Sequence, residues 1–102
     1  MSDTHEKRCY VLVHNDVAAS HDKMKVVLNS IVEIETWRTD IPNCFYIVSK
    51  KDASQLSKLI RSRIANQGRF LVSEITSNRQ GWLTPESWYL INHHRLKPAD
   101  KA

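Results

Sequence analysis

Short apolar segments recur along the chain in the patterns that strands require. Residues 9–14 and 44–48 are continuous apolar runs, which are typical of central strands paired on both edges. Residues 32–37 instead alternate apolar and polar side chains, as an edge strand with one solvated side does. A further apolar stretch at residues 69–75 predicts the last strand. The pattern therefore predicts two central strands, one alternating edge strand and one closing strand.

Two amphipathic helices are predicted between these strands. Ser20 is suited to cap a first helix that runs to about Ser30. Asp52 and Gln55 have the spacing of a capping box and predict a second helix after them. The apolar side chains of each helix fall on one face, at Met24, Val27, Leu28 and Ile31 in the first and at Leu56, Leu59, Ile60 and Ile64 in the second.

The connections carry signals of turns and helix ends. Residues 39–43 have turn chemistry and include Pro42, which blocks strand pairing, so a hairpin is expected there. Gly68 stands where a glycine would end the second helix. Thr84 and Pro85 predict the start of a short closing helix, because proline is favoured at the first helical position.

This order of elements predicts an α+β fold of the ferredoxin-like type. A βαββαβ chain forms a four-stranded antiparallel sheet with two helices on one face, here followed by a short C-terminal helix. Right-handed crossovers place the first and third strands side by side in the middle. We expect these two strands to run parallel, so that their C-terminal ends share one edge of the sheet. The domain is expected to span residues 9–92, with loose tails at 1–8 and 95–102.

The composition excludes several classes of protein. The chain has 102 residues, 41% of them hydrophobic and 25% charged, which fits one globular domain and not a disordered or fibrous chain. No apolar run approaches the roughly 20 residues of a membrane helix. The polar N-terminus lacks the apolar core of a secretory signal, and 2 cysteines are too few for a disulfide framework. We therefore expect a cytoplasmic protein without a membrane partner.

A net charge of +4 raises the possibility of a nucleic-acid partner. The predicted shared edge collects Asn15 and Asp16, after the first strand, with Lys50 and Lys51, after the third. The N-termini of both helices would lie there too, and free N–H groups together with lysines can hold a phosphate. The alternative is that Lys50 and Lys51 belong to a solvated loop before a capped helix.

Further basic residues extend this hypothesis. Lys58 and Arg61 are three residues apart and share a face of the second helix, and Arg79 is another candidate. A basic helix face opposite an apolar stripe is either an ordinary solvated surface or a patch that follows a nucleic-acid backbone.

Metal chemistry has little support in the sequence. The histidines have no zinc-type spacing, and no cofactor is expected. Asp16 is the best ligand for Mg²⁺, although one carboxylate is a thin site unless a homodimer brings two together. Cys9 and Cys44 both begin predicted neighbouring strands, so we expect them to lie near each other as reduced, buried residues.

Several segments resemble the CRISPR-associated protein 2-like family, in particular its stand-alone, SinR-like branch. The resemblance spans roughly residues 9–92. The moderately specific part is Gly81-Trp82-Leu83. The other segments that carry it are Tyr10-Val11-Leu12-Val13-His14-Asn15, Thr36-Trp37, Phe70-Leu71-Val72-Ser73-Glu74-Ile75-Thr76, Asn78-Arg79-Gln80 and Trp88.

The resemblance implies a ferredoxin-like homodimer. Some members of the family are metal-dependent nucleases, and others are non-catalytic adaptors that hold DNA. The family's catalytic aspartate lies at the end of the first strand, where this chain has Asn15, with Asp16 next to it. Asparagine cannot act as an anionic Mg²⁺ ligand or as a base. Trp82 is expected to close the open face of the sheet, since a large aromatic side chain usually packs.

Three hypotheses about function remain. The first is a non-catalytic homodimeric adaptor that binds nucleic acid through its backbone, with Lys50, Lys51, Lys58, Arg61 and Arg79 as candidates. The second is an Mg²⁺-dependent endonuclease that acts on RNA or DNA through Asp16 of each protomer. The third is a protein-interaction module that pairs with a partner strand through an exposed sheet edge.

Overall fold

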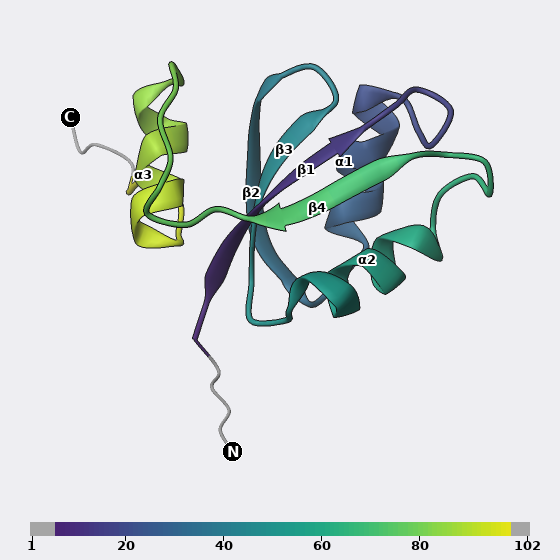
Figure 1. Ribbon diagram of the computed structural model, residues 1–102, viewed down its shortest axis with the longest axis horizontal. Helices are drawn as coiled ribbons and strands as arrows, with labels where there is room; N and C mark the ends of the chain where they lie inside the picture. The colour runs from purple at the N-terminus through teal and green to yellow at the C-terminus, as the bar shows by residue number, and fades with distance from the viewer. Residues whose placement is uncertain (1–5, 99–102) are drawn as a thin grey trace.

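The computed structural model describes residues 6–98, which form an α+β fold with four strands and three helices (Figure 1). The predicted tails include residues 1–5 and 99–102, which lie outside the described part. Within residues 6–98, no helix is long and apolar enough to cross a membrane. The elements are β1 (Arg8–His14), α1 (His21–Asn29), β2 (Ile34–Ile41), β3 (Cys44–Ser49), α2 (Ala53–Arg61), β4 (Phe70–Glu74) and α3 (Pro85–His93).

The four strands form one sheet in the order β2-β3-β1-β4, with every neighbouring pair antiparallel. The prediction that β1 and β3 lie side by side in the middle is confirmed. The prediction that they run parallel is wrong, because Arg8 pairs with Ser49 and Val13 with Cys44. The physical reason is the β2–β3 hairpin, which reverses the chain, so that β3 opposes both of the strands between which it lies.

The corrected strand direction separates residues that were expected to meet. Asn15 and Asp16 follow β1 at one end of the sheet, whereas Lys50 and Lys51 follow β3 at the other. The starts of α1 and α2 lie at opposite ends for the same reason, so the predicted shared edge for phosphate does not exist.

The two cysteines are separated in the same way. Cys9 pairs with Val48 and Cys44 with Val13, so they lie at opposite ends of the sheet, and both are free thiols. Burial raises the pKa of Cys9 to about 12. This thiol therefore stays protonated and unreactive at neutral pH.

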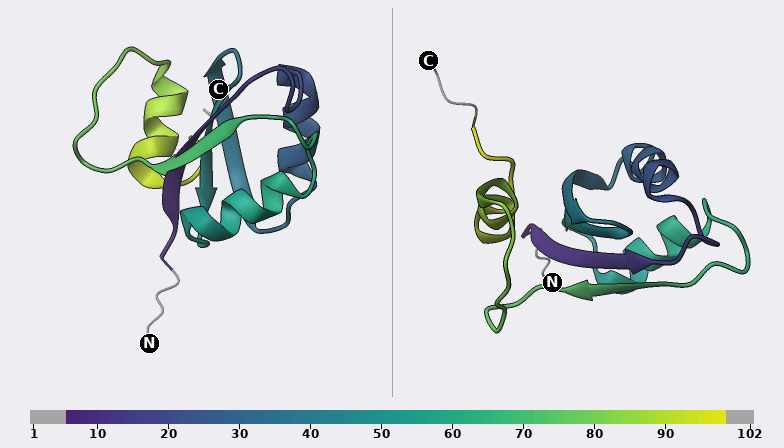
Figure 2. Two further views of the ribbon diagram at one scale, coloured as in Figure 1. Left: turned by 45° about the vertical axis from the view of Figure 1, so that its right-hand side comes forward. Right: turned by 90° about the horizontal axis from the view of Figure 1, so that it is seen from above.

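Side chains of the central strands alternate between two apolar layers. Tyr10 and Phe45 face α1 and α2, where they pack with the helix stripes around Met24 and Leu56. The intervening residues face α3 and form a smaller cluster of Cys9, Tyr46, Val48, Leu90 and Ile91. Figure 2 shows α3 on the side of the sheet away from α1 and α2. Both faces of β1 and β3 are thus covered over most of their length, with Val13 exposed at the end of β1, and this coverage explains their continuous apolar sequences.

The predicted helix starts are confirmed. Ser20 Oγ accepts a hydrogen bond from the backbone N–H of Lys23 at 3.0 Å. Asp52 and Gln55 form the predicted capping box, with bonds of 2.8 and 3.1 Å. Thr84 caps α3 directly before Pro85. These signals are read correctly from sequence because each depends on a side chain and the backbone only three residues away.

The hairpin is also confirmed, although β2 is longer than predicted and runs through Asp40 to Ile41 before the turn at Pro42 and Asn43. Asn43 has a φ of 60°, a left-handed conformation that asparagine tolerates better than most residues.

Gly68 does not end α2, which stops at Arg61. A Cβ atom placed on Gly68 would lie 2.3 Å from the Cα atom of Ala18. The glycine is therefore required because the loop before β4 crosses the backbone of the loop before α1 at very close range.

Candidate nucleic-acid interface

The turn after β1 uses its polar side chains to hold the backbone. Asn15 Oδ1 accepts hydrogen bonds from the N–H groups of Ala18 at 3.0 Å and Arg69 at 3.1 Å. Asp16 Oδ1 accepts one from Asn43 Nδ2 at 2.8 Å. Among residues 6–98, no group of three or more histidine, cysteine, aspartate or glutamate side chains is arranged to hold a metal ion. The geometry thus gives Asn15 and Asp16 roles in joining loops.

Two histidines near this turn pack as aromatic rings. His14 and His21 both stack on Phe45, with centroids 5.8 and 4.8 Å away. The Nδ1 atom of His14 lies 3.0 Å from the carbonyl of Asn15 and therefore carries the proton. His21 Nδ1 accepts from the N–H of Asn43 at 2.9 Å. These contacts fix both rings within the fold.

The loop from β3 to α2, at the opposite end of the sheet, is held firmly. Tyr10 Oη, on β1, donates to the carbonyl of Lys51, directly after the neighbouring strand β3, at 2.6 Å. Ser49 Oγ donates to the carbonyl of Glu33 at 2.7 Å and accepts from the N–H of Lys51 at 3.0 Å. The backbone that carries the two lysines is therefore fixed, while their ammonium groups remain outside.

Lys51 and Lys58 face one hollow of about 250 Å³. The helix brings them together because Lys58 lies in α2, which starts directly after this loop. The hollow is lined by Glu33, Lys51, Gln55, Lys58 and Leu59. Glu33 is the single acidic side chain in that lining, so two cations face one anion.

The predicted basic residues separate into free and engaged groups. Lys50, Lys51 and Lys58 are exposed, and the three ion pairs found within residues 6–98 involve none of them. Arg61, in the last turn of α2, donates one bond to the carbonyl of Asn66 at 2.9 Å. The ion pairs present are Lys7–Glu35, Lys25–Asp22 and Arg38–Asp40.

Arg79 lies apart from this group, in the segment between β4 and α3. Its guanidinium donates to the carbonyl of Thr76 at 2.9 Å and to Asn92 Oδ1. It therefore ties this segment to α3, and the structure does not bring it to the lysines.

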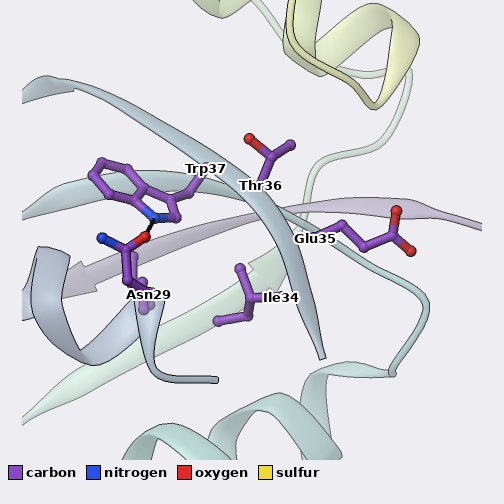
Figure 3. Close-up of a pocket in the computed structure, with 6 residues that line it drawn as sticks. Asn29, Ile34, Glu35, Thr36 and Trp37 are labelled. Atoms are coloured by element: carbon purple, nitrogen blue, oxygen red, sulfur yellow. Dashed lines mark hydrogen bonds between the residues drawn. The ribbon is translucent and has the colours of Figure 1, made fainter. Parts of the chain in front are cut away.

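Another hollow, of about 370 Å³, lies between α1 and β2 (Figure 3). Trp37 Nε1 donates to Asn29 Oδ1 at 2.9 Å across it, and the ring packs edge-on to Phe45. Figure 3 shows Glu35 pointing away from this pair, and its carboxylate binds Lys7 at 2.9 Å. Trp37 is thus a packing residue that fixes β2 against α1.

The expectation for Trp82 is wrong. Its side chain is 99% exposed, and a Cβ atom on the neighbouring Gly81 would meet nothing within 4 Å. Leu83 and Trp88 occupy the packing position instead, against the cluster under α3. The loop turns the Trp82 side chain outward, and no local sequence pattern predicts that orientation.

Part of the sheet face that carries α3 stays open. Ile41, Cys44, Val13 and Leu71 form a row across all four strands, since each pairs with the next. Val13, Ile41 and Leu71 are large apolar residues that remain exposed. Val13 and Leu71 also line a mainly apolar hollow of about 500 Å³. We name Ile41, Cys44, Val13 and Leu71 the open row.

A polar clamp that sequence reasoning missed joins β2 to the start of α3. Asp40 accepts hydrogen bonds from the N–H and hydroxyl of Thr84 at 3.1 and 3.2 Å. Arg38 Nε donates to the fully buried Ser87 Oγ at 3.2 Å. Burial acts to raise the pKa of Asp40, but hydrogen bonds from Ser87 and Thr84 and the charge of Arg38 outweigh it and lower that pKa. Asp40 lies in the segment predicted as a turn and Arg38 directly before it, so the available signal was a pair of opposite charges two residues apart.

Comparison of the chain with protein-family models, with curated proteins and with solved structures gives no match.

Proposed function

We propose that this protein is a non-catalytic module that binds nucleic acid through phosphate contacts. The observation that carries this proposal is the group of three unpaired lysines, Lys50, Lys51 and Lys58, on the rigid junction of β3 and α2. Ammonium groups without ion pairs can neutralise phosphates at no cost in broken salt bridges, and a fixed backbone limits the entropy lost on binding. Arg61 extends the same helix face toward its C-terminus.

The turn after β1 supports the non-catalytic part of the proposal. Asn15 stands where the resemblance places a catalytic aspartate, and its oxygen already accepts two backbone hydrogen bonds. Asp16 is held by Asn43. The alternative, an Mg²⁺-dependent endonuclease using Asp16, predicts cleavage of RNA or DNA by the wild type that is lost in Asp16→Ala. No cleavage by the wild type with Mg²⁺ supports the adaptor.

We also propose that the chain is a cytoplasmic homodimer of the ferredoxin-like, CRISPR-associated protein 2-like type. The strand order β2-β3-β1-β4 and the quoted resemblance support this assignment. The open row supports self-association, because a two-fold axis would place one apolar row against an identical one. Sedimentation should then give twice the mass of 11.9 kDa. A monomer that binds no nucleic acid would instead favour pairing through a sheet edge.

Binding of a fluorescein-labelled duplex, followed by anisotropy at low salt, tests the main proposal. Lys51→Gln/Lys58→Gln should weaken binding by at least about tenfold, since it removes two of three phosphate contacts. Lys23→Gln/Lys25→Gln, on α1, makes the same change in net charge and should retain nearly wild-type affinity. Equal loss in both variants would mean that net charge alone, not the β3–α2 junction, drives binding. No binding by the wild type would refute the proposal.

A further inference from the structure

The segment between β4 and α3 presents a tryptophan to solvent in a way that folding does not explain. Trp82 is 99% exposed, more than any other large apolar side chain described. The segment arcs outward beyond α3 in the left view of Figure 2. Full exposure of an indole forgoes the burial that normally stabilises this residue and leaves the ring free to contact a partner.

The segment is anchored at both ends. On the β4 side, Ile75 donates its N–H to the carbonyl of Cys9 at 2.8 Å, and Arg79 binds Thr76 and Asn92. On the α3 side, Thr84 is held by Asp40. Trp82 therefore lies on a short loop whose backbone is tethered at both ends, which limits the backbone entropy that a partner must remove on binding.

A polar hollow lies beside this loop. It has a volume of about 360 Å³, which is within the size range of ligand sites. Its lining offers hydroxyl, amide and guanidinium groups next to one indole, from Ser77, Arg79, Gln80, Trp88 and Asn92. Arg79 and Gln80 in this lining belong to the same loop as Trp82, so the hollow lies at the base of the loop that carries the exposed ring.

The lining of this hollow is positively charged, because Arg79 is its one charged residue. A second cation, Arg95, follows the C-terminal end of α3. Arg95 donates to Tyr89 Oη at 2.9 Å and lies over that ring, with 5.6 Å to its centroid. Aromatic rings interleaved with cations are the arrangement by which proteins hold unpaired bases and their phosphates.

We propose that this surface binds single-stranded nucleic acid, with one base stacked on Trp82 and the adjoining nucleotide in the hollow against Trp88. The inference rests on the proposed nucleic-acid function and assigns it a second surface, distinct from the lysines at the β3–α2 junction. The hollow beside this loop has a polar lining, in which Arg79 and Gln80 can donate hydrogen bonds to a phosphate or to a base edge. The surface therefore favours bases over an apolar protein face.

Anisotropy with fluorescein-labelled dT12 and with a labelled duplex tests this assignment. Trp82→Ala should weaken dT12 binding about 5- to 150-fold, the loss expected for one stacked base, and leave duplex binding within twofold. Trp82→Phe should retain most of the dT12 affinity, because a phenyl ring still stacks. Val32→Ala, at another highly exposed apolar position, is the matched control and should leave both affinities unchanged.

The outcomes separate the two proposals. Absence of binding to both oligonucleotides refutes the proposed function and the inference together. Duplex binding with dT12 affinity unaffected by Trp82→Ala overturns the inference alone. If Trp82→Ala instead lowers the sedimenting mass while dT12 affinity is unchanged, Trp82 is a protein contact and the inference is wrong.

Discussion

Asn15 provides a sharp test of how the turn after β1 is built. Asn15→Ala removes the oxygen that accepts two backbone N–H groups. Ala18 is 4% exposed, so water cannot replace the lost hydrogen bond to its N–H group. Leaving this buried donor unpaired costs about 1–3 kcal/mol of folding free energy. Arg69 is exposed, so its N–H group can form a hydrogen bond with water instead, and loss of its bond to Asn15 changes the stability little. We expect the free energy of unfolding to fall by about 2 kcal/mol, or about 8–16 °C in Tm.

Asn15→Asp separates this structural role from a catalytic one. A carboxylate can accept the same two hydrogen bonds, so this variant should be as stable as the wild type. It also restores the aspartate that the resemblance places there, yet should not cleave nucleic acid with Mg²⁺, because the backbone N–H groups occupy that side chain.

Urea unfolding followed by circular dichroism, with Asn78→Ala as an exposed asparagine control, measures these effects. An Asn15→Ala protein as stable as the control would refute the proposed hydrogen-bond role. So would an Asn15→Asp protein as unstable as Asn15→Ala. Cleavage by purified Asn15→Asp would show that the turn has room for a catalytic carboxylate.

Three further predictions follow from other contacts. Gly68→Ala should destabilise the fold by more than about 1 kcal/mol in urea unfolding, because its methyl group meets the backbone of Ala18; a neutral result would show that the two loops separate easily. The lowered pKa of Asp40 means that its contribution to stability is fully present above the unfolded pKa of about 3.9 and is lost as pH falls through the lower folded value. Asp40→Asn should therefore flatten the pH dependence of stability below about pH 4, and an unchanged profile would contradict the role of its bonds to Thr84. Leu71→Asp, in the open row, should shift sedimentation from dimer to monomer without changing the circular dichroism spectrum, and a persistent dimer would exclude this row as the interface.

The local features of the fold are predictable from the sequence. The caps at Ser20, Asp52 and Thr84 each depend on contacts within three residues, so spacing alone identifies them. The central pair of strands is recognisable because both faces of β1 and β3 are buried over most of their length. The caps are predictable because their contacts are short-range, and the central strands are predictable because each is a continuous apolar run.

The features that were predicted wrongly from the sequence depend on contacts between segments that are distant in the chain. Gly68 looks like a helix end, but its role is set by Ala18, fifty residues earlier in the chain. The sequence prediction places Lys50 and Lys51 beside Asp16 because it takes β1 and β3 to be parallel. The hairpin before β3 reverses that direction, so the loop after β3 lies at the other end of the sheet. The exposure of Trp82 depends on how its loop is tethered at both ends.

The salt dependence of duplex binding tests the central claim most directly. If Lys50, Lys51 and Lys58 each neutralise one phosphate, log Kobs should fall against log salt with a slope of about −2.7, which is about a 40-fold loss between 50 and 200 mM. Lys51→Gln/Lys58→Gln should reduce that slope to about −0.9. A slope that the double variant leaves unchanged, or a wild type that binds no duplex at 50 mM salt, would contradict the account.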